Sequence, residues 1–263
     1  MKQTFSIITT VLNNKEFIED AINSVLNQTY PDIEYIIIDG GSTDGTLDII
    51  KKYENRITKL ISEPDNGIYD ALNKGIELSS GDIIGFLHAD DVFACNNAIE
   101  KVAKKFLLYP VRVIYSDLEY VKKKNLDKVF RYWKAGSYKN ISFSFGWMPP
   151  HPTLFVRREI YEQYGKFNTS YKIAADYDLI LRLLGKHKIP STYIKEVLVR
   201  MRIGGTSNMS IKNILKKSIE DYLILRRNKI GFPLLTVILK NLLKVRQFIY
   251  PLFFRSGSKS LPV

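Results

Sequence analysis

Apolar runs of strand length alternate with helical segments over the first 90 residues, and this alternation limits the fold more than any other feature of the chain. Patterns typical of strands occupy residues 5–11, 34–39, 57–62 and 83–87, and helical patterns occupy residues 14–28 and 68–78. Strand–helix–strand units join parallel strands through right-handed crossovers. We therefore predict an α/β fold with a Rossmann-like, mostly parallel sheet that helices flank on both faces.

The remaining sequence is consistent with one large domain and an appendage. The 263 residues contain a single cysteine, Cys95, which excludes an internal disulfide and a cysteine-rich zinc site. We find no internal repeat and no long linker rich in Gly, Pro or Ser. The predicted division is an α/β domain over residues 1–208 and a helical tail over residues 209–263. A cytoplasmic location is expected, because no signal-peptide cleavage site follows the apolar run of residues 5–12.

Positive charge is concentrated in this tail. The formal net charge of the chain is +12, and residues 209–263 carry +9 of it, from eleven Lys and Arg residues against Glu220 and Asp221. A basic segment on a nearly neutral body indicates an anionic partner, either phospholipid headgroups or nucleic acid.

The second half of the tail has an amphipathic pattern. Leu234 and Ile238 share a helix face with further apolar residues, and Lys240 and Lys244 lie roughly opposite. Its longest uncharged run is too short to span a bilayer, so an interfacial helix, peripheral on the inner face of the cytoplasmic membrane, is favoured. A helix packed on the protein or in a dimer is the alternative.

Carboxylates follow the predicted strands. Asp39 ends the second strand, Asp65 follows the third, and Asp90 and Asp91 follow the fourth. Any one of them could simply cap a helix. Ligands of open α/β sheets, however, bind outside the carboxyl ends of the strands, where these side chains would converge. Together they predict a ligand site.

Five segments, in this order along the chain, resemble the inverting family-2 glycosyltransferases of the GT-A fold. They are Ser-Ile-Ile-Thr-Thr-Val-Leu-Asn-Asn at 6–14, Ser-Val-Leu-Asn-Gln-Thr-Tyr at 24–30, Ile-Asp-Gly-Gly-Ser-Thr-Asp-Gly-Thr at 38–46, Glu-Pro-Asp-Asn-Gly-Ile-Tyr-Asp-Ala-Leu-Asn-Lys-Gly at 63–75 and Gly-Asp-Ile-Ile-Gly-Phe-Leu-His-Ala-Asp-Asp at 81–91. The resemblance extends to about residue 184. It is closest to members that build bacterial exopolysaccharide, such as those of colanic acid assembly.

The resemblance implies roles for the strand-end residues. Thr10, Asp39 and Asp65 would hold the nucleoside of a nucleotide-sugar donor, for which we favour UDP. Asp90, in the family's Asp-x-Asp position, would bind Mn²⁺ or Mg²⁺, hard ions that prefer carboxylate and phosphate oxygens. The metal would stabilise charge on the departing nucleoside diphosphate. Asp91 is a second candidate for this position.

Two positions depart from the family pattern. His88 stands at the first position of Asp-x-Asp, and Gly40 replaces the second acidic residue that is common after Asp39. Neutral imidazole can ligate Mn²⁺ but suits Mg²⁺ poorly. His88 is therefore a candidate for contact with the metal, ribose or phosphate, with an ordinary strand-end histidine as the alternative.

An inverting transfer needs one carboxylate to take the proton of the acceptor hydroxyl. The family's Glu-Asp motif appears here as Ala175-Asp176. The resemblance implies that Asp176 is the catalytic base. A helix cap is the alternative, since a helical pattern starts at the same place.

Three further residues are candidates for the surroundings of the sugar. Trp147 and His151 lie in a proline-rich segment where related enzymes place an acceptor loop; tryptophan offers a sugar platform or plain core packing. Arg202, with Gly204 and residues 205–207, could cover the diphosphate or be part of a solvated loop.

These features predict a metal-dependent glycosyltransferase that adds one sugar to a glycan or polyprenyl-diphosphate-linked acceptor in bacterial surface polysaccharide synthesis. Residues 9–14 contain no glycine, which excludes the Rossmann dinucleotide fingerprint, and no P-loop motif is present. The Gln-x-x-Arg-Trp segment of processive synthases is absent, so single addition is expected. The alternative is a non-catalytic basic protein that binds membrane or nucleic acid on an α/β scaffold. That alternative leaves the strand-end aspartates unexplained, so no nucleic-acid partner is expected.

Overall fold

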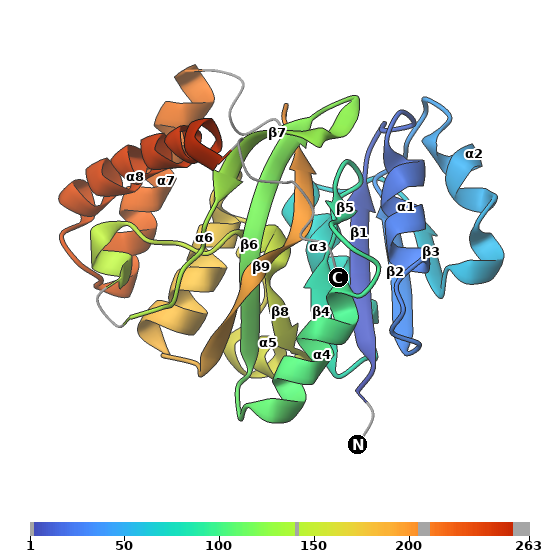
Figure 1. Ribbon diagram of the computed structural model, residues 1–263, viewed down its shortest axis with the longest axis horizontal. Coiled ribbons are helices and arrows are strands. Elements are labelled where there is room, and N and C mark those ends of the chain that lie inside the picture. The colour runs from blue at the N-terminus through green and yellow to red at the C-terminus, as the bar shows by residue number, and fades with distance from the viewer. Residues whose placement is uncertain (1–2, 140–141, 205–210, 255–263) are drawn as a thin grey trace.

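The computed structural model describes residues 3–139, 142–204 and 211–254 (Figure 1). These residues form a nine-stranded sheet in the order β3-β2-β1-β4-β8-β6-β9-β5, with β7 paired to β6. Helices cover both faces of the sheet, and the last two helices lie together beyond one of its ends (Figure 1).

The N-terminal part of the sheet is parallel. Its strands are β1 (Phe5–Val11), β2 (Ile33–Asp39), β3 (Lys59–Ser62) and β4 (Ile83–Phe86). The connecting helices are α1 (Ile18–Leu26), α2 (Thr46–Lys51), followed by a 3₁₀ turn at Glu54–Arg56, and α3 (Ile68–Leu78). The predicted strand–helix alternation is confirmed, and it places the ends of β1, β2 and β4 at one edge.

The remaining strands make the sheet mixed. β8 (Phe155–Arg157) is antiparallel to both β4 and β6 (Val113–Lys122), and β9 (Ser191–Arg202) is parallel to β6. β7 (Asn125–Trp133) is antiparallel to β6, as a connection of two residues requires. The short β5 (Val92–Phe93) pairs antiparallel with β9.

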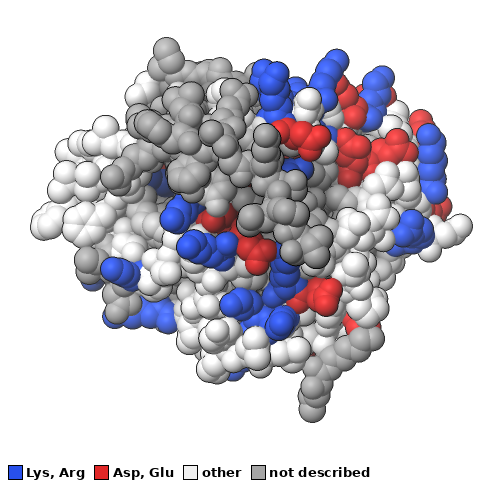
Figure 2. Space-filling model, viewed as in Figure 1, with Lys and Arg blue, Asp and Glu red and all other residues white. Residues whose placement is uncertain are grey.

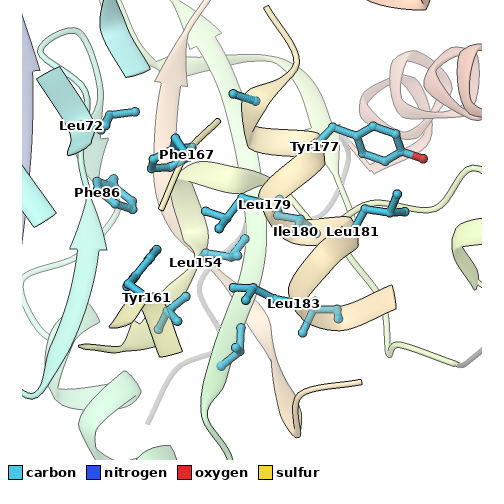
Figure 3. Packing of buried hydrophobic residues seen from close by; sticks show 14 of the residues in the cluster. Leu72, Phe86, Leu154, Tyr161, Phe167, Tyr177, Leu179, Ile180, Leu181 and Leu183 are labelled. Carbon is cyan, nitrogen blue, oxygen red and sulfur yellow. The ribbon is translucent and has the colours of Figure 1, made fainter. Parts of the chain in front are cut away.

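Two apolar layers enclose the sheet. Ile7 and Ile8 belong to different buried clusters, because neighbouring residues of a strand face opposite sides. One cluster packs under α1 and α4 (Ala98–Leu108). The other packs under α3, α5 (Arg158–Tyr164) and α6 (Ala175–Ile180), which continues as a π-helical turn over Leu181–Lys186. Figure 3 shows how side chains of this second cluster converge from α6 and the neighbouring strands.

The C-terminal helices are docked on this second cluster. They are α7 (Ile211–Asn228) and α8 (Pro233–Phe254). Two short 3₁₀ segments, Ser142–Phe145 and His151–Thr153, occur earlier in the chain, before β8. Ile224 and Leu225 of α7 are fully buried, and Val237 of α8 joins them. A Cβ atom on Gly146 would lie 2.4 Å from the backbone nitrogen of Lys240, so α8 touches the chain there directly. The boundary at residue 208 stays a prediction, but the helices beyond it pack on the body.

The predicted orientation of Lys240 is wrong. Its exposed fraction is 4%, and its ammonium group lies 2.8 Å from the carboxylate of Asp221 and 3.1 Å from the ring centroid of Tyr177. Burial lowers the pKa of Lys240 to about 7, although the Asp221 carboxylate acts in the opposite direction. A buried lysine needs such a partner, so this residue stabilises the α7–α8 contact and does not face lipid. The side chain of Lys244 lies outside the described residues.

Candidate active site

An open cleft of about 1470 Å³ extends from the carboxyl ends of β1 and β4 to the C-terminal helices. Seven of the ten predicted site residues line it, namely Thr10, Asp65, His88, Asp90, Trp147, His151 and Asp176. Asp39, Asp91 and Arg202 do not line it in the part of the chain that the structure describes. The strand ends therefore converge as the sequence predicts, and seven of the ten side chains face the cleft that they form.

At the end of the cleft near β1, two side chains have hydrogen-bond acceptor atoms that the described residues leave free to bind a ligand. The buried hydroxyl of Thr10 has no hydrogen-bond partner among the described residues. Asp65 accepts a hydrogen bond from the backbone N–H of Gly67 at 2.8 Å. A Cβ atom on Gly40 would lie 2.5 Å from the carboxylate of Asp65, so a side chain at position 40 would require that carboxylate to shift.

Asp39 orders the loop that follows β2. Its carboxylate accepts hydrogen bonds from the hydroxyl of Ser42 at 2.5 Å, the backbone N–H of Ser42 at 3.1 Å and the hydroxyl of Ser62 at 2.6 Å. The side chain is fully buried and does not line the cleft. Its predicted contact with the nucleoside stays a prediction.

Arg202 supports the loop that carries Asp90. The prediction that Arg202 covers the diphosphate is therefore corrected. Its guanidinium group donates to the carbonyl oxygens of Asp90 and Lys123 and pairs with the carboxylate of Asp20 at 2.5 Å. The side chain is 3% exposed, so it is not free to close over a ligand. Residues 205–207, predicted to share that role, lie outside the described residues.

Asp91 is buried beneath the same loop. Its carboxylate accepts a hydrogen bond from the backbone N–H of Arg202 at 3.3 Å, and its exposed fraction is zero. Burial, followed by the nearby charge of Asp90, raises its pKa well above the usual range. Burial also raises the pKa of Asp90, although less, since Arg202 and Lys123 oppose the effect. Asp90 is thus the carboxylate of this pair that faces the cleft.

A chain of three side chains connects β4 to α6 across the floor of the cleft. The Nε2 atoms of His88 and His151 lie 3.1 Å apart, and Nδ1 of His151 lies 3.2 Å from a carboxylate oxygen of Asp176. The hydroxyl of Tyr69 lies 3.4 Å from the other oxygen and donates at 2.8 Å to the carbonyl of Ile173. This arrangement fixes the orientation of the Asp176 carboxylate.

Asp176 lies in the first turn of α6 and does not cap it. The carboxylate of Glu220 on α7 binds the segment just before the helix, and accepts hydrogen bonds from the backbone N–H groups of Lys172, Ile173 and Ala174 at 2.9–3.1 Å. Sequence reasoning missed Glu220. The available signal was that it is one of only two acidic residues in the basic tail.

The pKa of Asp176 is lowered. Burial alone would raise it, but the neighbouring basic groups His151, Lys217 and Lys240 outweigh burial, and the pKa ends below the usual value. Burial lowers the pKa of His151 and lowers that of His88 to about 3. The carboxylate form of Asp176, which is the form that can accept a proton, is therefore favoured near neutral pH.

Comparison with known proteins agrees with this geometry. Residues 6–165 match the family described as Glycosyl transferase family 2. The chain belongs to this family. A PGL/p-HBAD biosynthesis glycosyltransferase of Mycobacterium bovis is 30% identical over 219 residues, which are 81% of this chain and 83% of the relative. The protein is therefore a glycosyltransferase.

Solved structures share the fold of this family-2 glycosyltransferase. A fragment of S. aureus TarS in complex with UDP-GlcNAc superposes with a TM-score of 0.61 at 15% identity, over 86% of this chain and 65% of the fragment. The mannosyltransferase PcManGT of Pyrobaculum calidifontis, in complex with GDP-Man and Mn²⁺, gives 0.63 at 17% identity, over 100% of this chain and 77% of the other. The chain spans 39% of the length of a longer TarS chain that it also matches. The predicted GT-A fold is confirmed.

The residues of the site fit a divalent cation that is held largely by the donor phosphates. No group of three His, Cys, Asp or Glu side chains suitable for a metal occurs in the described ranges, and Asp90 is the carboxylate in the expected position. Mg²⁺ and Mn²⁺ commonly use one or two carboxylates together with substrate phosphates. His88 contacts His151, which gives its ring a partner other than a metal.

Trp147 packs against the core, and its role as a sugar platform stays a prediction. Its indole N–H donates to the carbonyl of Ala135 at 2.7 Å, and its ring packs against Tyr115, Tyr138 and Phe143. The residue also lines the cleft. It is therefore a rigid wall of the site that is held by the core on its other side.

Acid should destabilise this glycosyltransferase through His88. Its pKa of about 3 in the folded protein lies below its usual 6.5, so the unfolded chain binds a proton that the folded chain does not bind between these values. The contribution of neutral His88 to the free energy of unfolding is therefore complete above about pH 6.5. This contribution is lost as the pH falls from about 6.5 toward 3. We expect His88→Asn to flatten the decline in the free energy of unfolding, measured by urea denaturation from pH 7 to pH 4. An equal decline in variant and wild type would contradict this.

Proposed function

We propose that this enzyme is an inverting, metal-assisted glycosyltransferase that transfers one sugar from a nucleotide sugar to a glycan or lipid-linked acceptor in bacterial surface polysaccharide synthesis. The observation that supports it best is the Asp176 carboxylate, which faces the same cleft as Asp65 and Asp90 and is held by His151. A retaining mechanism would need a nucleophilic carboxylate close to the anomeric carbon and a second acid. Asp176, ionised and in the first turn of a helix, suits single-step proton removal.

The residues divide the reaction between them. Thr10, Asp65 and Asp39 are assigned to the nucleoside, and Asp90 would hold Mn²⁺ or Mg²⁺ beside the diphosphate. The cation, when bound, supplies positive charge to the leaving group. Asp176 removes the proton from the acceptor hydroxyl as that oxygen attacks the anomeric carbon from the face opposite the leaving group. The proton stays on Asp176 and leaves later to solvent.

We assign the donor as a UDP-sugar. TarS structures contain UDP and UDP-GlcNAc, and the PcManGT structure contains GDP-Man, so both bases occur among proteins of this fold. The acceptor class follows from the motif resemblance to exopolysaccharide enzymes of the colanic acid type.

We place the enzyme peripherally on the inner face of the cytoplasmic membrane. No helix in residues 3–139, 142–204 and 211–254 has the length and apolar content of a membrane span. Among the side chains that the structure describes, seventeen large apolar ones are exposed, and ten of these lie on α7, on α8 or in the turn between them: Ile214, Leu215, Ile219, Tyr222, Leu223, Phe232, Leu234, Leu235, Ile238 and Leu242. In Figure 2 the left edge of the molecule, where Figure 1 shows α8, carries no charged side chains. Such a surface suits the interface of a bilayer.

A donor panel tests the proposed function. We expect one class among UDP-, GDP- and dTDP-sugars to raise the melting temperature of the purified enzyme, more with Mn²⁺ than with EDTA, because a ligand selective for the folded state stabilises it. The same donor should be hydrolysed slowly to the nucleoside diphosphate. If no nucleotide sugar binds or is hydrolysed, the proposed reaction is wrong. An acceptor product with retained anomeric configuration would contradict the inverting mechanism alone.

A further inference from the structure

The cleft is larger than one donor needs. Ligand pockets are typically about 300–1000 Å³, and this cleft measures about 1470 Å³. The residues assigned to the donor are at the end formed by β1, β3 and β4. The other end is formed by α7 and α8, through Asn213, Lys216, Lys217, Lys240 and Leu243. Room for a second ligand therefore lies between the base and the C-terminal helices.

Lysines gather at this second end. Lys216 and Lys217 are consecutive on α7, and Lys172 lies in the segment that leads into α6, where its backbone N–H donates to Glu220 of α7. We call Lys172, Lys216 and Lys217 the α7 lysine site. Lys172 and Lys216 are exposed and form no ion pair within the part of the chain that the structure describes.

Nearby carboxylates offset the charge of Lys217 in part, but not that of Lys172 or Lys216. Asp221 lies 3.8 Å from Lys217 and 2.8 Å from the buried Lys240, so the two lysines share its charge. The carboxylate of Glu220 is occupied by three backbone N–H groups at the start of α6. The α7 lysine site therefore presents a net positive charge to the cleft, and an anion would complete it.

The position of the site assigns it to the acceptor. The hydrogen bonds from the segment before α6 to Glu220 fix α7 next to the helix that carries Asp176. Thr10 lies on β1 and Asp65 follows β3, and Figure 1 shows both strands on the opposite side of the view from α7 and α8. In Figure 3 Tyr177 points from α6 toward α8, and its ring contacts Lys240 there. The base thus stands between the donor residues and the lysines.

We infer that the α7 lysine site binds a phosphate or diphosphate group of the sugar acceptor. Lysine ammonium groups suit phosphate as mobile point charges. Trp147, Met148 and Leu243 line the cleft near this end and give the rest of such an acceptor an apolar wall. This inference rests on the proposed transfer reaction. Its new content is that the acceptor is anionic and that α7 recognises the acceptor.

The test compares anion binding by three forms of the full-length enzyme. They are wild type, the Lys216→Gln/Lys217→Gln variant, and a control variant, Lys51→Gln/Lys52→Gln, which removes two consecutive exposed lysines at the C-terminal end of α2, outside the cleft. The donor site is first saturated with the nucleoside diphosphate that binds best. Inorganic pyrophosphate and the short lipid farnesyl diphosphate are then titrated by calorimetry.

We expect the wild type and the control to bind farnesyl diphosphate, and the α7 variant to bind it about tenfold or more weakly, because hydrogen bonds to charged groups are lost. A Lys216→Arg/Lys217→Arg variant should keep most of the affinity. Affinity for the nucleoside diphosphate itself should stay within about twofold in all forms. Equal affinity for pyrophosphate and farnesyl diphosphate would indicate a water-soluble phosphorylated acceptor. Tighter binding of farnesyl diphosphate would indicate a lipid-linked acceptor.

Two results would overturn the inference. One is equal binding of the anions by the wild type and the Gln variant, and the other is loss of nucleoside diphosphate affinity in the Gln variant, which would assign the lysines to the donor. Donor hydrolysis by the same preparations separates this failure from failure of the proposed function. Hydrolysis without anion binding refutes only the lysine site, and absence of hydrolysis refutes the transfer reaction.

Discussion

Asp176→Asn should lower the rate of sugar transfer by about 10²-fold or more, the scale expected for loss of a general base. Asparagine keeps the size of the side chain, and its oxygen can still face His151, which contacts the carboxylate at 3.2 Å, while the Tyr69 hydroxyl keeps its hydrogen bond to the carbonyl of Ile173. It cannot accept the proton of the acceptor hydroxyl. Dissociation constants for the nucleotide sugar should stay near the wild-type value, so the loss should fall on kcat.

Asp178→Asn is the matched control for this experiment. Asp178 lies on the same helix, two residues further on, is buried, and contacts Arg182 at 3.5 Å instead of the cleft. Its pKa is raised by burial, so the neutral side chain is a mild change at this position. We expect it to reduce stability more than transfer. Wild-type transfer by Asp176→Asn would remove the base from the mechanism.

The parallel half of the fold and most of the cleft could be predicted because their signals are local. The strand that ends at Asp39 and the one that precedes His88 are continuous apolar runs, and their carboxyl ends must meet at one edge of a parallel sheet. Seven of the ten predicted residues line the cleft for this reason.

The remaining features depend on partners that are distant in sequence. Arg202 reaches Asp20 across 182 residues, and Glu220 reaches the start of α6 across 46–48 residues. An arginine near a glycine-rich loop is equally typical of a phosphate contact, so no local pattern shows that its charge is already used. Charge periodicity also placed Lys240 on the solvent face, whereas packing against Gly146 and pairing with Asp221 bury it.

Asp90→Asn should abolish the effect of Mn²⁺ on nucleotide binding. In the wild type we expect about tenfold or tighter binding of the nucleoside diphosphate with Mn²⁺ than with EDTA, because a cation between Asp90 and the phosphates cancels their repulsion. Asparagine removes both the repulsion and the metal ligand. Binding in EDTA should therefore persist, while added Mn²⁺ should change the dissociation constant by less than about twofold.

Asp91→Asn provides the contrast that makes this result specific. Asp91 is adjacent in sequence but fully buried, and burial raises its pKa so that it favours the neutral form. Its contact with the backbone N–H of Arg202 can be kept by an asparagine oxygen. Calorimetric titrations of this variant should show the full Mn²⁺ effect.

If Asp90→Asn retains that effect and Asp91→Asn loses it, the cation is held by the second carboxylate after a rearrangement of the loop. If both variants retain the effect, the phosphates alone recruit the metal and Asp90 only shapes the cleft.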